Sequence, residues 1–552
     1  MKRLLKAFYG NKYIIFVLLL TFVAVLPLIH SGLPPTHDGE YHIIRFFEFE
    51  KAIQHGDLYP RWAMDLNNGY GLPLFNYVYP FPNYIAVIFH SFGFSFISAF
   101  KLNLILATLL GSLFFYYWLR DYWGNIGGLV AAVSYSYAPY RFVDMYVRGS
   151  VGEVWVLAFI PAFLWSISRS IKNKSSNYAI ISGIFFAAII FSHNILAMMF
   201  FIFSLSYGLL LVIQSNNWKR SIKYIIYSFG VAVSLSAIFW FPALIETSYV
   251  RGLEIYSVRD NFPELYQLLI PSWGTGFSGG YIGNQMSFQI GIMPLIGVLI
   301  LVFYGFLFRR LKNNWVIVLF FTFWFAIIVF FMLRSSVFLW EAVPLLHYFQ
   351  FPWRFLSLTM VCTSFINGSI ILFLPEKIRY LSAGIIICLT IFTTLNYTKP
   401  AYYHNRTDSY YLSRSNFIDG TNSPGDLFNT RWMGKVAKTN HDIRFLGGDG
   451  RITVIDERNS RRIYNVDSFS GGEVVASLAY FPGWTVFQDG VNKASSVTKE
   501  GLLTFKVDKG KHVIEVVFLD TIVRQIAKTW SITIAIVLFI LLYRKHIKRK
   551  LK

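Results

Sequence analysis

The stretch HDGEYHIIR near the N-terminus carries the residue types that acid–base chemistry needs. If this stretch is helical, Asp38, His42 and Arg45 fall at i, i+4 and i+7, on one stripe of the helix. An aspartate can deprotonate a hydroxyl, a histidine can bind a metal, and an arginine can hold a phosphate. The alternative is structural: Asp38 caps the helix and the other polar residues form its solvated face. The pattern alone leaves both interpretations open.

A second charged stretch, APYRFVDMYVRGSVGEVW, has four charged residues at or just past a predicted membrane boundary, namely Arg141, Asp144, Arg148 and Glu153. Charges near membrane depth are costly, and they usually face a cavity or one another. Asp144 and Arg148 have the i, i+4 spacing of a structural ion pair. The same arginine can also be shared between an acid and a bound phosphate. Both roles remain open here.

Two further motifs carry polar residues to the ends of apolar runs. In FSHNI, His193 and Asn194 form a short turn between two spans, where a helix cap is the simplest role. In HYFQFPWRFLSL, Arg354 lies at the mouth of a span, where it either reaches to lipid headgroups or binds a phosphate through two hydrogen bonds. The glycine-rich segment 274–283 lacks the Lys-Ser/Thr ending of a P-loop, so we expect no nucleotide cofactor.

The elements that position these residues are membrane helices. The chain has 552 residues, of which 55% are hydrophobic and only 14% charged, and its mean hydropathy is +0.48. Such a composition is that of a protein dissolved largely in lipid. Window analysis predicts about twelve spans: 13–30, 98–119, 126–143, 152–168, 177–192, 195–213, 224–242, 290–308, 314–333, 353–374, 381–396 and 528–543.

The net charge of +21 reflects membrane topology and not nucleic-acid binding. With the N-terminus inside, the inside segments are short and basic, and they include Lys219, Arg220 and Lys223, the segment 308–313 and the C-terminal tail. The outside segments hold mixed charge. The positive-inside rule therefore predicts a multi-pass protein of the cytoplasmic (plasma) membrane, with both termini cytosolic and the charged motifs outside. Cys362 and Cys388 both fall in apolar runs, so we expect neither a disulfide nor a zinc site.

Two long outside segments are patterned. The first contains a predicted amphipathic helix over 39–55, whose apolar side (43, 44, 46, 47 and 49) is expected to lie at the lipid interface. The second, 397–527, shows strand-like alternation with turns at Asp489-Gly490 and Lys509-Gly510. The predicted domains are therefore a transmembrane domain over 1–396, an extracytoplasmic β-sandwich-like domain over 397–527, and a last helix with a basic cytosolic tail over 528–552.

The motifs together resemble the GT-C superfamily of integral-membrane glycosyltransferases, which place an acidic motif in the first outside loop. More narrowly, HDGEYHIIRF, LYPRW, GYGLPLFNYVYP, YRFVDMYVRG, SHN and FPWRF are similar to bacterial membrane proteins of the YfhO-like group. That group is often labelled as related to 6-pyruvoyl-tetrahydropterin synthase, although the zinc histidines and soluble fold of that enzyme have no counterpart here. The resemblance implies a GT-C-like helical domain followed by the β-rich domain.

The resemblance also implies a function: transfer of a sugar from a polyprenyl-phosphate donor to a glycan, lipid or protein acceptor in the cell envelope. It implies that Asp38 acts as general base or, with Glu40, as ligand of a divalent metal such as Mg²⁺ or Mn²⁺. The expected site residues for the donor phosphate and substrate are His42, Arg45, Arg61, Asp144, Arg148, Glu153, His193, Asn194 and Arg354.

Two other functions remain to be weighed. A lipid or polysaccharide transporter would place charges within mid-membrane helices and show interrupted repeats. A scaffold for envelope assembly would tolerate substitution of the acidic loop. Convergence of Asp38, Asp144, Arg148 and Arg354 in one place would favour the enzyme over both.

Overall fold

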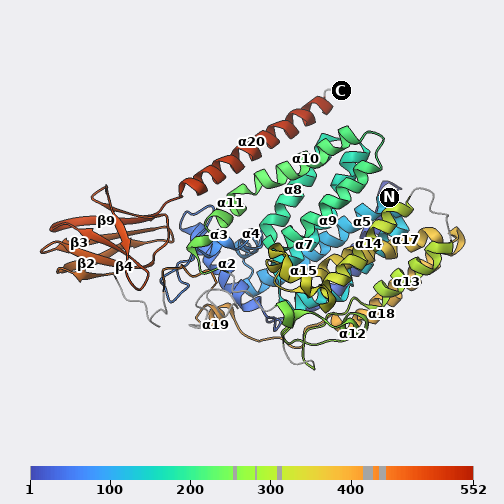
Figure 1. Ribbon diagram of the computed structural model, residues 1–552, viewed down its shortest axis with the longest axis horizontal. Helices are drawn as coiled ribbons and strands as arrows, with labels where there is room; N and C mark the ends of the chain where they lie inside the picture. Colours follow the sequence, from blue (N-terminus) through green and yellow to red (C-terminus); the bar gives the residue numbers. More distant parts are fainter. Residues whose placement is uncertain are drawn as a thin grey trace. The chain divides into compact units, whose positions relative to one another are not determined.

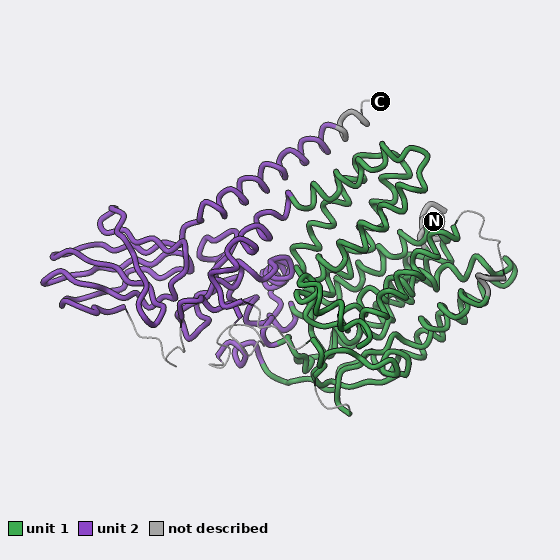
Figure 2. The backbone as a smooth tube through the Cα atoms, in the orientation of Figure 1, with its two compact units in different colours: residues 1–39, 100–233, 255–406 green, residues 40–99, 234–254, 407–552 purple. Residues whose placement is uncertain are grey.

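The computed structural model describes residues 2–252, 258–279, 283–307, 314–413, 427–433 and 443–550 (Figure 1). The predicted basic segment 308–313 and the last two residues lie outside these ranges. The described chain divides into two compact units, coloured separately in Figure 2. Unit 1 comprises residues 1–39, 100–233 and 255–406, and unit 2 comprises 40–99, 234–254 and 407–552.

Unit 1 contains most of the apolar helices. Eight helices in the described ranges are long and apolar enough to cross a membrane, or nine if the bent pair α10 and α11 forms one span. Two shorter apolar helices add to these. The main helices are α1 (Lys2–Val25), α5 (Phe96–Ser136), α7 (Val151–Lys172), α8 (Ser176–Ser192), α9 (Asn194–Ile213), α10 (Trp218–Leu235), α11 (Ala237–Ile245), α13 (Ile292–Leu307), α14 (Trp315–Met332), α17 (Leu356–Phe373), α18 (Arg379–Thr394) and α20 (Ile522–Lys550).

Each of the twelve predicted ranges coincides with helix, but two of them share α5. That helix is broken at Gly124, whose φ of +69° is left-handed and favours glycine. At this end of the helices Asp121 pairs with Arg169, with Oδ2 and Nε 2.6 Å apart. Both residues come from segments predicted to lie inside. The pair therefore agrees with the prediction that these two segments share one side, and the count of twelve stays a prediction.

Unit 2 begins with the first long loop. Its helix α2 (Gly39–Gln54) was expected to turn its apolar side to lipid, and this is wrong. Ile44 and Phe49 are buried against Ala63, Leu72 and other apolar side chains of the loop that follows. The apolar stripe of α2 thus packs on protein, because the segment 63–78 folds back over it.

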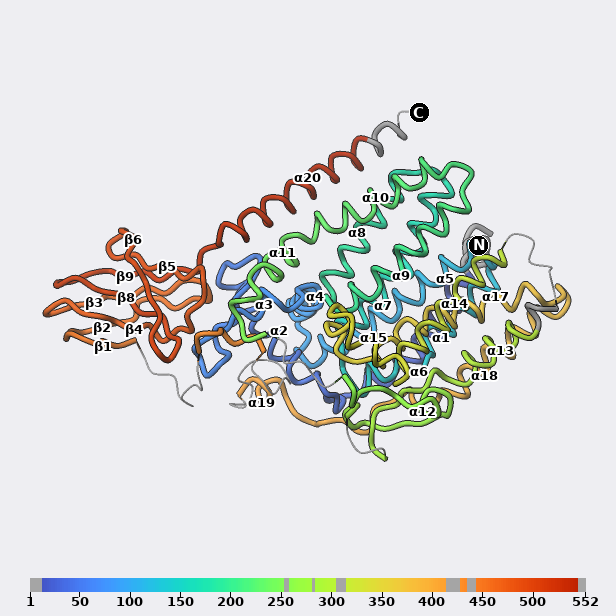
Figure 3. Tube along the Cα trace, in the orientation of Figure 1, coloured from blue at the N-terminus to red at the C-terminus, as the bar shows by residue number. Residues whose placement is uncertain are grey.

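The β-domain of unit 2 is a pair of antiparallel sheets, as predicted (Figure 3). One sheet has the order β1-β4-β8-β7 and the other β2-β3-β9-β5-β6. The strands are β1 (Arg444–Gly447), β2 (Gly450–Glu457), β3 (Arg461–Ser468), β4 (Gly472–Ala479), β5 (Trp484–Gln488), β6 (Val491–Lys493), β7 (Ser495–Val497), β8 (Leu502–Val507) and β9 (Gly510–Phe518). Asp489 and Gly490 both have positive φ, as a two-residue hairpin turn between β5 and β6 requires.

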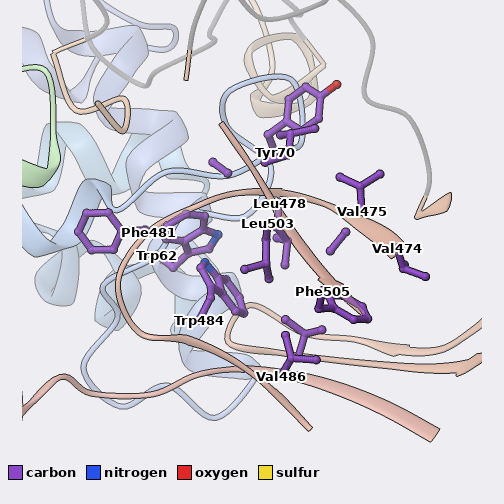
Figure 4. Packing of buried hydrophobic residues seen from close by; sticks show 14 of the residues in the cluster. Trp62, Tyr70, Val474, Val475, Leu478, Phe481, Trp484, Val486, Leu503 and Phe505 are labelled. Carbon is purple, nitrogen blue, oxygen red and sulfur yellow. The ribbon is translucent and has the colours of Figure 1, made fainter. Parts of the chain in front are cut away.

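The core of unit 2 joins the β-domain to the first loop. Trp62, which comes from that loop, is fully buried and meets Trp484 edge-on with ring centroids 5.3 Å apart. Figure 4 shows Trp62 among Phe481, Trp484 and Leu503 of the β-domain. Gly71 allows this packing, because a Cβ there would lie 2.3 Å from Nε1 of Trp62. The first loop and the β-domain therefore share one hydrophobic core.

Candidate active site

A buried group of charged side chains lies in unit 1, with Glu153 at its centre. Glu153, in the first turn of α7, is fully buried. Its Oε1 accepts hydrogen bonds from Nη2 of Arg148 at 2.8 Å and from Nε of Arg354 at 2.9 Å. Its Oε2 lies 2.6 Å from Nη1 of Arg148 and accepts a hydrogen bond from the Tyr140 hydroxyl at 3.2 Å. A buried carboxylate is stable only with such partners.

Arg148 links Glu153 to a second acid. Its Nη1 donates to Oδ1 of Asp144 at 2.6 Å, and its guanidinium lies over the ring of Trp353, 4.9 Å from the centroid. The predicted i, i+4 pair therefore exists, but on a turn of π-helix, Val143–Arg148. Such turns are rare and frequent at functional sites. We call Tyr140, Asp144, Arg148, Glu153, His193 and Arg354 the Glu153 cluster.

The loop before α2, which carries His37 and Asp38, is attached to this cluster by its backbone. The amide of His37 donates to the carbonyl of Val147, and that of Asp38 to the carbonyl of Arg148, both at 2.9 Å. Gly149 makes the approach possible: its φ is +68° and a Cβ there would lie 2.4 Å from Oγ1 of Thr36. The backbone of Asp38, the predicted base, is therefore hydrogen-bonded directly to the backbone of Arg148.

His193 is a helix cap that also lies beside Glu153, and its predicted role in substrate binding stays a prediction. It is the N-cap of α9, and its Nδ1 accepts a hydrogen bond from the amide of Leu196 at 3.4 Å. An accepting Nδ1 carries no proton, so the proton of the neutral ring is on Nε2. That atom lies 3.8 Å from Oε1 of Glu153. Asn194 is the first residue of α9 and extends the turn.

The balance of charge around the cluster is positive. Arg141 is fully buried, and its guanidinium lies over the ring of Tyr135, 4.5 Å from the centroid. Among the described residues its Nη1 and Nη2 have no hydrogen-bond partner, and neither has Oδ2 of Asp144. Burial, reinforced by the charge of Glu153, raises the pKa of Asp144 well above its usual range. The Glu153 cluster and Arg141 thus hold three guanidinium groups and two carboxylates, of which that of Asp144 favours the neutral form, and this excess suits an anion.

His37 precedes Asp38 and is another titratable group at this end of unit 1. Its Nε2 lies 2.9 Å from the carbonyl of Thr275, and its ring stacks on Phe277. Burial lowers the pKa of His37 below the ordinary value. The neutral ring, with its proton on Nε2, is therefore the favoured form at neutral pH.

The structure brings together five predicted residues, namely Asp144, Arg148, Glu153, His193 and Arg354, with the backbone of Asp38 beside them. Asn194 lies beside His193 in unit 1, and the remaining four, Glu40, His42, Arg45 and Arg61, belong to unit 2. There Glu40 and Arg45 are partly buried on α2, while His42 is 2% exposed and its ring neighbours Phe46. Their predicted roles stay predictions.

Arg61 lies in a different buried network within unit 2. Its Nη1 donates to Asn76 at 2.8 Å, and its Nε is 3.5 Å from Oδ1 of Asp520. Glu246 accepts hydrogen bonds from Asn76 at 2.9 Å, from Thr521 at 2.7 Å and from Arg524 at 3.0 Å. We call Arg61, Asn76, Glu246, Asp520, Thr521 and Arg524 the Glu246 cluster.

Sequence reasoning missed several members of the site. Arg141 and Tyr140 stand in the quoted motif YRFVDMYVRG, but spacing alone did not relate them to Glu153. Gln350 accepts a hydrogen bond from Nη1 of Arg354 at 2.8 Å. The ring of Trp353 lies under the guanidinium of Arg148. The proximity of these residues depends on contacts between segments far apart in the chain.

The site was also tested for a metal. Within the described ranges, no three His, Cys, Asp or Glu side chains come together in a way that could hold a metal ion. Both carboxylates of the Glu153 cluster are paired with arginine, and this set of residues does not fit a cation.

Fold and site define a multi-pass helical membrane protein with a β-sandwich domain and a buried, positively charged site. Residues 75–400, more than half of the chain, match the family of membrane proteins described as having a 6-pyruvoyl-tetrahydropterin synthase related domain. The chain belongs to this family, which confirms the family suggested by the motifs. No curated protein matches the sequence.

Solved structures give weaker similarities. ArnT from Cupriavidus metallidurans, bound to undecaprenyl phosphate, is 13% identical with a TM-score of 0.44, covering 73% of this chain and 68% of that one. The arabinofuranosyltransferase AftD from Mycobacteria is 12% identical with a TM-score of 0.46, and the match covers 72% of this chain and 28% of that one. The Archaeoglobus fulgidus oligosaccharyltransferase has a TM-score of 0.37 at 12% identity, and the match covers 73% of this chain and 55% of that one. TM-scores below 0.5 carry no argument about activity, so the proposal below rests on the site.

Proposed function

We propose that this protein is a membrane glycosyltransferase that moves a sugar from a polyprenyl-phosphate donor to an extracytoplasmic cell-envelope acceptor. The observation that carries the proposal is the positive Glu153 cluster, to which the loop bearing Asp38 is hydrogen-bonded. A buried excess of guanidinium charge suits a phosphate, and a carboxylate beside it suits deprotonation of a hydroxyl. Motif resemblance to GT-C enzymes supports the same reaction.

In the proposed reaction, the Asp38 carboxylate takes the proton of the acceptor hydroxyl. The acceptor oxygen attacks the anomeric carbon, and the bond from that carbon to the phosphate oxygen breaks. The electron pair leaves with the polyprenyl phosphate, and the configuration of the sugar inverts. Arg148 and Arg354 neutralise the charge that develops on the leaving phosphate. Preorganised charge of this kind is usually the largest catalytic contribution.

Glu153 positions the two arginines and does not react. It holds Nη2 of Arg148 and Nε of Arg354 through the same oxygen, Oε1. Both guanidinium planes are therefore fixed before substrate binds, so little reorganisation is needed during the reaction. Trp353 and Tyr140 cover Arg148 and keep water from it.

The test is the Asp38→Asn variant, purified in detergent and assayed with polyprenyl-phosphate glucose and polyprenyl-phosphate mannose as probe donors and a cell-envelope extract as acceptor. We expect transfer to fall by about 10²- to 10⁴-fold with an unchanged melting temperature. Asp449→Asn, which alters an exposed carboxylate before β2, is the matched control and is expected to keep full activity. Equal transfer by a folded Asp38→Asn variant would reject Asp38 as the base.

A further inference from the structure

A second polar site lies at the other end of unit 1. A cavity of about 480 Å³ opens between the starts of α8 and α10 and is lined by Lys219, Arg220 and Lys223. Among the described residues, the two acids of the predicted inside segments, Asp121 and Glu376, pair with Arg169 and Arg379 and not with these three side chains. The cavity is thus lined by positive charge without a matching acid.

The cavity lies far from the Glu153 cluster. Ser176, which lines it, is the first residue of α8, whereas His193 follows the last residue of the same helix. Seventeen residues at 1.5 Å each give a separation of about 26 Å along the helix. This is close to the thickness of the hydrocarbon layer. The two sites therefore lie at opposite faces of the membrane.

The polar groups around the cavity suit a phosphate. Asn217 precedes α10, and its Oδ1 accepts a hydrogen bond from the amide of Arg220 at 3.0 Å. The helix start adds partial positive charge to that of the side chains. The hydroxyl of Tyr224 lies 3.4 Å from Nε of Arg220 and holds this guanidinium at the cavity wall. The lysine ammonium groups attract phosphate oxygens as compact charges, and the arginine guanidinium can donate two parallel hydrogen bonds to them.

The apolar surroundings identify the source of the phosphate. Ile213, Trp218 and Ile226 next to the cavity are 79%, 60% and 61% exposed. In a membrane protein such side chains face lipid, and an exposed tryptophan typically lies at headgroup depth. A phosphate held here is therefore one that carries acyl chains alongside α10.

We propose that this cavity binds the phosphate of an anionic phospholipid headgroup from the leaflet on the basic side of the membrane. The site is independent of the proposed glycosyl transfer. Basic side chains near an anionic membrane surface each contribute about 1 kcal/mol of attraction, or about fivefold in affinity. Three of them give a preference for anionic over neutral lipid on the order of 100-fold.

The experiment measures lipid retention by native mass spectrometry of the full-length protein. Protein is reconstituted in nanodiscs of phosphatidylcholine containing a small fraction of phosphatidylglycerol, then released into detergent. We expect the wild type to retain phosphatidylglycerol and the triple variant Lys219→Gln, Arg220→Gln, Lys223→Gln to bind it about 100-fold more weakly. The matched control removes the same charge elsewhere on the predicted basic side, by Lys172→Gln, Lys377→Gln and Arg544→Gln, and should bind as the wild type does.

Thermal unfolding of both triple variants checks that they are folded, which is expected because the substituted side chains are exposed. A second arm adds inorganic phosphate to delipidated protein. Phosphate binding as tight as that of phosphatidylglycerol would overturn the lipid assignment in favour of a soluble phosphate. Undiminished retention by the cavity variant, or equal loss in the control, would overturn the site itself.

Discussion

The Glu153 cluster of unit 1 and the Glu246 cluster of unit 2 are built from the same kinds of side chain, but their charges differ in balance. In the Glu246 cluster two guanidinium groups, of Arg61 and Arg524, meet two carboxylates, of Glu246 and Asp520. In the Glu153 cluster and the adjoining Arg141, three guanidinium groups meet Asp144 and Glu153, and the pKa of Asp144 is raised. A cluster whose charges balance needs no further ion for neutrality, whereas an unbalanced cluster has positive charge left for an anion.

The two clusters also differ in what they connect. The Glu246 cluster joins the first loop, the end of α11 and the start of α20 within unit 2. The Glu153 cluster joins α7, α9 and the segment before α17, and the loop before α2 is attached to it. The first arrangement ties distant segments of the chain together. The second encloses a site, and the comparison predicts that the two respond differently to substitution.

The largest expected effect comes from breaking the balanced cluster. Glu246→Gln leaves the buried Arg524 without a carboxylate partner, and we expect the free energy of unfolding to fall by about 3–5 kcal/mol. Thermal unfolding in detergent, followed by tryptophan fluorescence, measures the change. The control Glu515→Gln breaks the part-exposed pair with Arg461 and should cost less than about 1 kcal/mol. Equal changes in the free energy of unfolding for the two variants would contradict a structural role for the Glu246 cluster.

A buried acid in unit 2, Glu48, sharpens the comparison, because no guanidinium group among the described residues pairs with it. Glu48 is 2% exposed, and burial, together with the neighbouring charge of Asp65, raises its pKa to about 8. The folded protein therefore keeps a proton on Glu48 that the unfolded chain releases near pH 4.5. Stability is expected to fall as pH rises from about 4.5 to about 8, by about 1.4 kcal/mol per unit at most.

Unfolding measurements at pH 6.0 and 7.5 test this expectation. The wild type should lose about 2 kcal/mol between the two values. Glu48→Gln removes the titrating group and keeps the shape, so its stability should change little over the same range. If the stability of Glu48→Gln falls with pH as steeply as that of the wild type, the pH dependence comes from another group.

The smallest effect is expected at Arg141, which was not among the predicted site residues. If its charge contributes to anion binding, Arg141→Met should raise KM for the polyprenyl-phosphate donor about tenfold, which corresponds to about 1.4 kcal/mol. Methionine preserves packing against Tyr135. If the residue were only structural, replacing an unpaired buried charge by an apolar side chain would leave KM unchanged and maintain or increase stability.

Much of the fold could be predicted from periodicity and charge. The helical spans and the β5–β6 pair with its turn at Asp489-Gly490 follow from local sequence. The turn at Lys509-Gly510 connects β8 and β9, which lie in different sheets, and this could not be predicted from the turn residues. The burial of α2 could not be predicted, because an apolar stripe suits lipid and protein equally. The segment that covers α2, residues 63–78, is separated from it by a loop, so the sequence pattern does not show that the two pack together.

The site was predictable where its residues are close in sequence, as for Asp144, Arg148 and Glu153. It was not predictable where partners are distant. Arg354 reaches Glu153 across 201 residues, and Arg61 is placed beside Ile238 across 177. The motif around Arg61 does not indicate which cluster this arginine joins. Only the tertiary structure shows that it belongs to the Glu246 cluster.

The binding of a polyprenyl phosphate tests the central claim most directly. Affinity of purified protein for undecaprenyl phosphate is measured for the wild type, Arg354→Gln and Arg524→Gln, below the unfolding temperature of all three. Each variant removes one buried guanidinium, from the Glu153 and the Glu246 cluster respectively. We predict that Arg354→Gln binds at least about tenfold more weakly, since a charge-assisted hydrogen bond is lost, and that Arg524→Gln binds as the wild type does. Equal affinity in all three proteins, or loss in Arg524→Gln alone, would contradict the account.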